Sequence, residues 1–175
     1  MTGSIWLTGL PSAGKSTLAY AFADRVRERH RVQVLDGDVV RATFFPELGF
    51  GEADRAANVR RIGAMAQMLA GHGVLVLVPV IAPYREARDH VRSAHDQAGI
   101  PFAEVFVDAG LPTCAARDVK GLYARAKRGE ITGLTGFDAP YEEPENPELR
   151  LRTDQCSVNE CLAAMDNLLA DLGCA

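Results

Sequence analysis

The chain has 175 residues, of which 47% are hydrophobic and 24% charged, and a formal net charge of −4. This length predicts one domain with a substantial core. The negative net charge leaves no basic field for nucleic acid or for an anionic membrane surface, so we expect neither as a partner. The longest apolar run, residues 74–82, is about half of what crosses a bilayer, and residues 1–3 carry no basic leader segment. We therefore expect a cytoplasmic protein.

The cysteines and histidines show no pattern of a metal site or a disulfide. They are Cys114, Cys156, Cys161 and Cys174, and His30, His72, His90 and His95. No two cysteines form a C-x-x-C pair, and no histidine stands at ligand spacing from them. We expect free thiols in a reducing compartment, and histidines on helix surfaces.

Strand-like and helical segments alternate along the chain. The strand-like segments are residues 4–10, 32–35, 74–81, 103–107 and 149–151, and the helical ones are residues 15–29, 52–71, 84–97, 111–117 and 158–172. Such alternation predicts parallel β-α-β units. The run at 74–78 is apolar without alternation, which is typical of a central strand covered on both faces, although a buried helix would look similar. We predict a three-layer α/β fold with a five-stranded parallel sheet and a single domain over residues 1–175.

One segment departs from the average composition. Residues 120–147 are rich in Gly, Pro, Glu and basic residues. The segment is too long for a simple connection, so we predict a mobile lid over a functional site. Its cations Lys127 and Arg128 would help to neutralise a phosphate, although a solvated surface is the better-supported alternative for each.

Residues 9–16 read Gly-Leu-Pro-Ser-Ala-Gly-Lys-Ser, a complete G-x-x-x-x-G-K-[ST] phosphate loop. It lies between a predicted strand and a predicted helix, which is the context that this motif needs and which a chance glycine-rich turn would lack. Its backbone N–H groups would converge on an anion at the helix N-terminus. Lys15 would reach the β- and γ-phosphates, and the Ser16 hydroxyl would bind Mg²⁺. The predicted ATP-binding residues here are Gly9, Leu10, Pro11, Ser12, Ala13, Gly14, Lys15, Ser16 and Thr17.

A phosphate loop alone does not separate a GTPase, a motor, a transporter ATPase and a small-molecule kinase. The N-K-x-D string that reads guanine is absent from the sequence. The D-x-x-G string at residues 118–121 follows a helical segment and not a strand, so we interpret it as coincidence. The short chain favours a compact kinase.

Two acids follow the second predicted strand, in the string Asp36-Gly37-Asp38. Ligands of open parallel sheets bind beyond the carboxyl ends of the strands, so these acids should face the phosphate loop. One acid would then order Mg²⁺ and its waters, and the other would accept a proton from a substrate hydroxyl. The alternative is an Asp-Gly turn whose acids cap the next helix.

Arginines gather farther along, around Phe50 and Asn58; they are Arg41, Arg55, Arg60 and Arg61. Arg85 and Arg88 follow the end of the third predicted strand. Charges at helical spacing usually form a solvated face. Guanidinium groups at this edge of a sheet would instead bind an anionic acceptor.

These strings together resemble the adenylylsulfate kinase (APS kinase) family, which phosphorylates the 3′-hydroxyl of adenosine 5′-phosphosulfate (APS) with MgATP to give PAPS. The matching strings fall in the family order over residues 5–152: 6–10, 13–17, 35–38, 48–50, 54–55, 58–63, 81–85, 117–123, 135–136, 140–142 and 144–148. Lys-Gly-Leu-Tyr at 120–123 and Pro-Glu-Asn-Pro at 144–147 are far more discriminating than the phosphate loop.

The resemblance implies a P-loop kinase fold with a closing lid and a role for each matched residue. Lys15 and Asp38 would be catalytic, Ser16 and Asp36 would bind Mg²⁺, and Arg117 would lie near the ATP base. Phe50 would stack on the APS adenine, with Leu134 of the lid on its other face. The residues that would hold APS are Asp38, Arg41, Phe50, Arg55, Asn58, Ile81, Ala82, Lys120 and Leu134. The family also implies a homodimer and a functional link with ATP sulfurylase.

Three positions depart from the family pattern. Ala82 replaces a serine described as phosphorylated, so direct in-line transfer is the coherent mechanism here. Leu134 replaces a phenylalanine and offers apolar contact without ring stacking, and Val39 replaces an asparagine. These changes leave open a P-loop kinase of another nucleoside or of a small secondary metabolite. A nucleotide sensor or an accessory partner of ATP sulfurylase could dispense with its acids, yet Asp36 and Asp38 are both present.

Overall fold

The computed structural model describes residues 2–173. A five-stranded parallel sheet runs through its centre in the order β2-β3-β1-β4-β5. The strands are β1 (Ser4–Thr8), β2 (Val32–Val34), β3 (Leu75–Pro79), β4 (Phe102–Asp108) and β5 (Leu149–Arg152). The predicted α/β fold with a five-stranded parallel sheet is confirmed.

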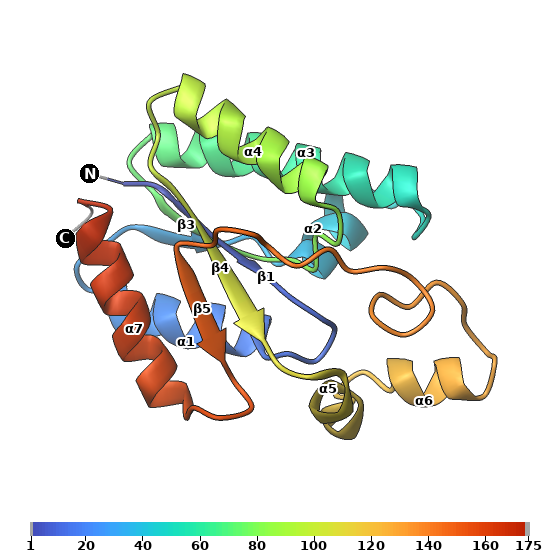
Figure 1. Cartoon of the computed structure of the whole chain (residues 1–175). Helices are drawn as coiled ribbons and strands as arrows, with labels where there is room; N and C mark the ends of the chain where they lie inside the picture. Colours follow the sequence, from blue (N-terminus) through green and yellow to red (C-terminus); the bar gives the residue numbers. More distant parts are fainter. Residues whose placement is uncertain (1, 174–175) are drawn as a thin grey trace.

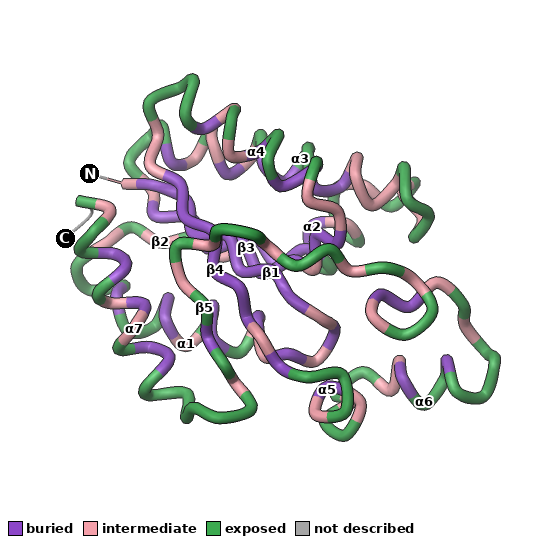
Figure 2. The backbone as a smooth tube through the Cα atoms, viewed as in Figure 1, coloured by how far each residue is buried: buried purple, intermediate pink, exposed green. Residues whose placement is uncertain are grey.

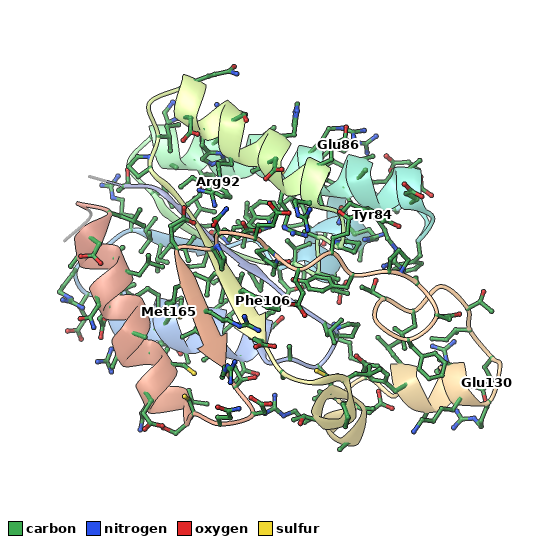
Figure 3. All side chains as sticks on the ribbon, viewed as in Figure 1. Tyr84, Glu86, Arg92, Phe106, Glu130 and Met165 are labelled. Atoms are coloured by element: carbon green, nitrogen blue, oxygen red, sulfur yellow. The ribbon has the colours of Figure 1, made fainter. Side chains whose placement is uncertain are left out.

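Helices cover both faces of the sheet, with α2, α3 and α4 on one face and α1 and α7 on the other (Figure 1). The helices are α1 (Lys15–Val26), α2 (Gly37–Phe44), α3 (Glu52–Gly71), α4 (Arg85–Gln97), α5 (Leu111–Arg117), α6 (Leu122–Lys127) and α7 (Val158–Asp171). Successive side chains of β1 enter opposite cores, because neighbours in a strand point to opposite faces. Ile5 and Leu7 lie in the core with α1 and α7, and Trp6 lies in the core with α3 and α4. Buried backbone follows the sheet, and side chains fill the space between the layers (Figures 2 and 3).

Two short helices were not predicted, α2 and α6. Asp36 is the N-cap of α2, and its carboxylate accepts the N–H of Asp38. The capping alternative for this acid is therefore correct as to geometry. Asp118 accepts the N–H groups of Tyr123 and Ala124 at the start of α6. The D-x-x-G string therefore begins a helix and does not follow a strand, which agrees with its interpretation as a coincidental match to a GTPase motif.

The predicted lid segment leaves the body of the protein after α5 and returns across the carboxyl ends of the strands to β5 (Figure 1). It contains α6 and a compact loop, in which Asp138 accepts the N–H groups of Gly133 and Leu134. The Gly136 N–H donates to Ala139 O at 2.8 Å and closes the loop. The lid therefore has an internal structure of its own.

The prediction that the histidines lie on helix surfaces is wrong for His95, which is fully buried on α4. Its ring nitrogens lie 2.9 Å from Val91 O and from Ser4 Oγ, because this face of α4 packs on the sheet. Cys114, Cys156 and Cys161 are free thiols, and Cys174 lies outside the described residues. Among residues 2–173, no helix has the length and apolar character needed to cross a bilayer.

Candidate active site

The phosphate loop follows β1 and leads into α1, as the motif predicts. Gly9 adopts φ 149°, and a Cβ built there would lie 2.3 Å from Val107 O. Gly14 adopts φ 105° and is the N-cap of α1. Residues with a side chain rarely adopt either conformation, so both glycines are needed for the loop to turn. The loop therefore directs its backbone N–H groups toward one point beyond the end of β1.

Lys15 is buried beneath this loop. Its ammonium donates hydrogen bonds to Gly9 O at 2.9 Å and to Leu10 O at 2.7 Å. Burial lowers the pKa of Lys15 to about 8, although the charge of Asp38 opposes this shift. Because these carbonyls are neutral, the ammonium still lacks a full counter-charge.

Three side chains from distant parts of the chain hold the loop from outside. Arg117 donates to Ala13 O at 3.3 Å and to Thr153 O at 2.6 Å, so the structure brings Arg117 to the phosphate loop. The Thr153 hydroxyl donates to the same Ala13 carbonyl at 2.7 Å, and the Tyr123 hydroxyl donates to Pro11 O at 3.0 Å. We did not predict Thr153 or Tyr123. The signals were present, since Tyr123 ends the Lys-Gly-Leu-Tyr string and Thr153 follows the last strand.

The two residues predicted to bind Mg²⁺ meet beside the loop. The Ser16 hydroxyl donates to Asp36 Oδ2 at 2.6 Å, and Asp36 is buried. Gly37 lets α2 approach β3, because a Cβ there would lie 2.6 Å from Val80 Cγ2. A hydroxyl beside a carboxylate offers the oxygen ligands that Mg²⁺ prefers. Within residues 2–173, no three His, Cys, Asp or Glu side chains gather into a metal cage.

Asp38 lies in the first turn of α2, with its side chain exposed, and forms an ion pair with Lys120. Partial burial lowers the pKa of Lys120, but the hydrogen bond and charge of Asp38 outweigh it, and the net direction is upward. The ammonium therefore stays charged. The structure thus brings together the predicted base and a predicted acceptor-binding cation from the lid.

Phe50 precedes α3 and is 69% exposed. The guanidinium of Arg41 lies 4.6 Å from the centroid of its ring, and Arg41 Nη1 donates a hydrogen bond to Gly49 O. The exposed ring with a cation over it can accept a flat, electron-rich partner by stacking.

Arg55 joins this region to the lid. Its guanidinium donates to Phe50 O at 2.6 Å, to Gly133 O at 2.6 Å and to the Thr135 hydroxyl. One turn farther along α3, Asn58 is 1% exposed, and neither polar atom of its amide has a hydrogen-bond partner among the described residues. A buried amide without partners is rare and marks a place where a ligand or water completes the structure.

One expectation for this region needs correction. Leu134 is not an exposed wall facing Phe50; it is 7% exposed and belongs to the hydrophobic cluster that includes Leu10, Tyr123 and Ala126. Asp138 causes this placement, because its bonds to the N–H groups of Gly133 and Leu134 fold the loop inward. The exposed ring of this loop is Phe137, which we did not predict. It lines a cavity of about 600 Å³ between the end of β4 and the returning lid segment, together with Phe106.

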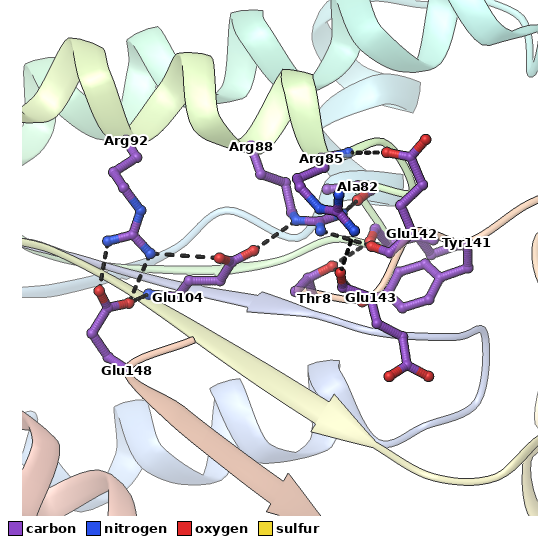
Figure 4. Close-up of polar contacts among 11 residues, drawn as sticks. Thr8, Ala82, Arg85, Arg88, Arg92, Glu104, Tyr141, Glu142, Glu143 and Glu148 are labelled. Carbon is purple, nitrogen blue, oxygen red and sulfur yellow. Dashed lines mark hydrogen bonds and ion pairs between the residues drawn. The ribbon is translucent and has the colours of Figure 1, made fainter. Parts of the chain in front are cut away.

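The remaining arginines do not converge on the site. Arg88 is 2% exposed and is bound by Glu104, Ala82 O and Glu142 O (Figure 4). Arg85 pairs with Glu145 at 2.8 Å, and Arg61 pairs with Glu47. The expectation that Arg88 binds an anionic acceptor is wrong, because buried partners already bind its guanidinium. Arg61 and Arg85 lie in exposed ion pairs, as the alternative of a solvated face expects, although Nε of Arg85 has no hydrogen-bond partner among the described residues. Ile81 and Ala82 do lie at the carboxyl end of β3, beside the phosphate loop.

Comparison with known proteins agrees with this geometry. The sequence model of the family described as adenylylsulphate kinase matches residues 1–152. The adenylyl-sulfate kinase of Microcystis aeruginosa is 49% identical over 171 residues, covering 97% of this chain and 92% of that protein. The corresponding enzyme of Chloroflexus aurantiacus is 52% identical, covering 96% and 87% of the two chains.

Among solved structures, the APS kinase CysC of Mycobacterium tuberculosis, in complex with AMPPNP and APS, superposes with a TM-score of 0.92 at 45% identity. The match covers 97% of this chain and 98% of that one. Sequence match, structural match and site geometry thus agree, and the chain belongs to the adenylylsulphate kinase family.

Proposed function

We propose that the chain transfers the γ-phosphoryl group of ATP to the 3′-hydroxyl of APS, giving PAPS and ADP. One observation carries this proposal: the Ser16–Asp36 hydrogen bond joins the phosphate loop to the acid-bearing start of α2. The donor phosphates and Asp38 then share one edge of the sheet. A similar solved enzyme binds an ATP analogue and APS, which supports the choice of both substrates.

On the donor side, the triphosphate lies along residues 9–17, with the adenine toward Arg117. The ammonium of Lys15 exchanges the carbonyls of Gly9 and Leu10 for phosphate oxygens, which carry the charge that it lacks here. Ser16 and Asp36 would hold Mg²⁺, which neutralises phosphate charge when bound. Positioning and charge neutralisation are the main contributions of an enzyme to phosphoryl transfer.

On the acceptor side, the adenine of APS stacks on Phe50. Its phosphosulfate is held by Arg41, Arg55 and Lys120, and its ribose by the unpartnered amide of Asn58. When Lys120 turns to the phosphosulfate, Asp38 loses its ion pair and becomes free to accept a hydrogen bond from the 3′-hydroxyl. Acceptor binding and activation of the base are then linked.

In the transfer step, the 3′-oxygen forms a bond to the γ-phosphorus while the bond from that phosphorus to the β–γ bridging oxygen breaks. ADP leaves with the electron pair of that bond, and Asp38 receives the hydroxyl proton. Ala82 has no hydroxyl to carry the phosphoryl group, so the transfer occurs directly between the two substrates.

The test is ADP release with APS, adenosine, AMP or sulfate as the acceptor, followed by ³¹P NMR to locate the new phosphate. We expect turnover with APS and a phosphate on the 3′-position. Turnover with another nucleoside and none with APS would favour the alternative kinase, and ATP binding without any turnover would favour a sensor.

Three further predictions accompany this function: a cytoplasmic location, a homodimer and a functional link with ATP sulfurylase. A hexameric APS kinase from Thiobacillus denitrificans is similar to this chain, which covers 30% of that larger one. Light scattering during size-exclusion chromatography distinguishes the dimer from a monomer or a larger assembly.

A further inference from the structure

We propose that Thr8 and Tyr141 are positioning residues, which hold the Ile81 peptide against the entrance of the phosphate loop and so set the affinity for the acceptor. This inference rests on the proposed function and on the expectation, from the family resemblance, that Ile81 is one of the residues that hold APS. It concerns two residues to which neither the sequence motifs nor the acceptor site above gives a role.

Thr8 is the last residue of β1, directly before Gly9, and is fully buried. Its hydroxyl lies 2.6 Å from Ile81 O and 3.0 Å from the Tyr141 hydroxyl. The carbonyl can only accept, so the single proton of Thr8 is donated to Ile81 O. Tyr141 must then donate to Thr8. Burial raises the pKa of Tyr141, so its phenol keeps the proton that this bond requires.

The peptide that Thr8 holds begins a turn of unusual conformation. Ala82 adopts φ 44° and is 2% exposed, although it is not a glycine. A residue without glycine's freedom is strained in this region, and such strain persists where the surroundings over-determine it, often at ligand sites. The turn therefore needs side chains that fix its backbone by hydrogen bonds.

Arg88 holds the other end of this turn. Its Nη1 donates to Ala82 O at 2.7 Å, while its Nε donates to Glu104 Oε1 at 2.6 Å in the interior (Figure 4). Its Nη2 donates to Glu142 O at 2.7 Å, and Glu142 follows Tyr141 in the chain. Thr8 and Arg88 thus each bind the 81–82 turn and the returning lid segment at the same time.

Arg88 and the Thr8–Tyr141 hydroxyl pair differ in how they can be tested. Removing Arg88 would leave the buried carboxylate of Glu104 with Arg92 as its remaining cationic partner. The resulting loss of stability would mask any change in substrate affinity. The hydroxyl of Tyr141 can be removed alone, because its ring packs on Phe106 with the centroids 6.0 Å apart. The hydroxyl chain is therefore the part to vary.

The experiment compares Tyr141→Phe, Thr8→Val, the double variant and Thr8→Ser, with Tyr20→Phe as the matched control. Tyr20 lies half-exposed on α1. The loss of one hydrogen bond should raise the APS KM of Tyr141→Phe by about 3- to 10-fold. We expect the ATP KM and kcat to stay within about twofold, since the strained turn lies on the acceptor side. Thr8→Ser and Tyr20→Phe should behave as wild type.

Because both hydroxyls act through one chain, the double variant should be no worse than Thr8→Val alone. Unchanged KM values with a lowered Tm would overturn the inference and leave a structural role only, as would an equal rise of both KM values. Failure of the proposed function looks different, because wild type itself would then release no ADP with APS. In that case calorimetry measures the Kd of whichever tested acceptor supports turnover, for wild type and the same variants. An unchanged Kd in Tyr141→Phe then overturns the inference.

Discussion

The proposed donor half and the proposed acceptor half of the site are built in different ways. The donor half, residues 9–17 with Arg117 and Thr153, is a backbone cradle in which Lys15 is 8% exposed. The acceptor half consists of side chains, Asp38, Arg41, Phe50, Arg55, Asn58 and Lys120, and Phe50 is 69% exposed. Backbone groups form most of the first half, whereas side chains from α2, from α3 and from the segment 118–121 form the second, and Phe50 and Lys120 are exposed there.

The order of the strands explains this division. The sheet runs β2-β3-β1-β4-β5. After β1 the chain forms β2 and β3 on one side of this central strand, and it then crosses to form β4 and β5 on the other side. A crevice for ligands forms where the strand order reverses. Thr153 follows β5 and supports the donor half, while Asp36 and Ile81 follow β2 and β3 and border the acceptor half. Variants should therefore separate the two substrates.

Lys15→Ala should give the largest effect. Removing the cation that faces the β- and γ-phosphates should lower kcat by about 10²–10³-fold or more, because the charge that develops there loses a preorganised partner. Steady-state ADP release measures this, with Arg29→Ala, an exposed residue in the turn after α1, as the control. A kcat within about tenfold of wild type would show that the loop does not neutralise the reacting phosphates.

Asp38→Asn should lower kcat by about 10²-fold, at the low end for a general base, because a loose phosphoryl-transfer transition state needs little proton transfer. The ATP Kd should stay within about twofold. Asp89→Asn, an exposed acid on α4, is the control. If ATP affinity falls while kcat survives, Asp38 belongs to the metal site on the donor side.

ATP affinity should depend on pH through Lys15. Its pKa of about 8 in the free protein should rise on binding, because phosphate charge replaces neutral carbonyls. Below pH 8 the ammonium is charged in both states, so affinity is constant; above it, binding must take up a proton, and affinity falls by about tenfold at pH 9. Calorimetric Kd values from pH 7 to 9 measure this. Lys15→Met should give a flat profile, and a flat wild-type profile would contradict the assignment.

Leu134→Phe should give a smaller effect, on stability more than on catalysis. The larger ring enters a packed core and should lower the free energy of unfolding by about 1–3 kcal/mol. Urea unfolding measures this, with Phe137→Leu on the exposed part of the same loop as the control. Unchanged stability together with a several-fold lower APS KM would mean that residue 134 contacts the adenine of APS after all.

Local patterns predicted the parts of the molecule that local sequence determines. The five strands, α3 at Glu52–Gly71 and α5 at Leu111–Arg117 were predicted, as was the phosphate loop. The helices α2 and α6 were missed because the residues at their starts were given another interpretation, as a pair of site acids at 36–38 and as a coincidental D-x-x-G string at 118–121.

The missed contacts are non-local. Tyr123 binds Pro11 across 112 residues and Tyr141 binds Thr8 across 133, so no spacing along the chain announces them. Arg88 and Leu134 were expected in the site from charge and family position. Their burial follows from packing against Glu104 and the core, which composition does not reveal.

The division into two halves is tested most directly by binding. Calorimetry measures the Kd of APS and of a non-hydrolysable ATP analogue for wild type, Phe50→Ala and Lys15→Ala. Loss of base stacking should weaken APS by about 5- to 150-fold in Phe50→Ala, with the ATP analogue unchanged within twofold. Lys15→Ala should weaken the ATP analogue and leave APS unchanged. If Phe50→Ala weakens both ligands equally, or Lys15→Ala weakens APS, the two halves are not separate and the account is wrong.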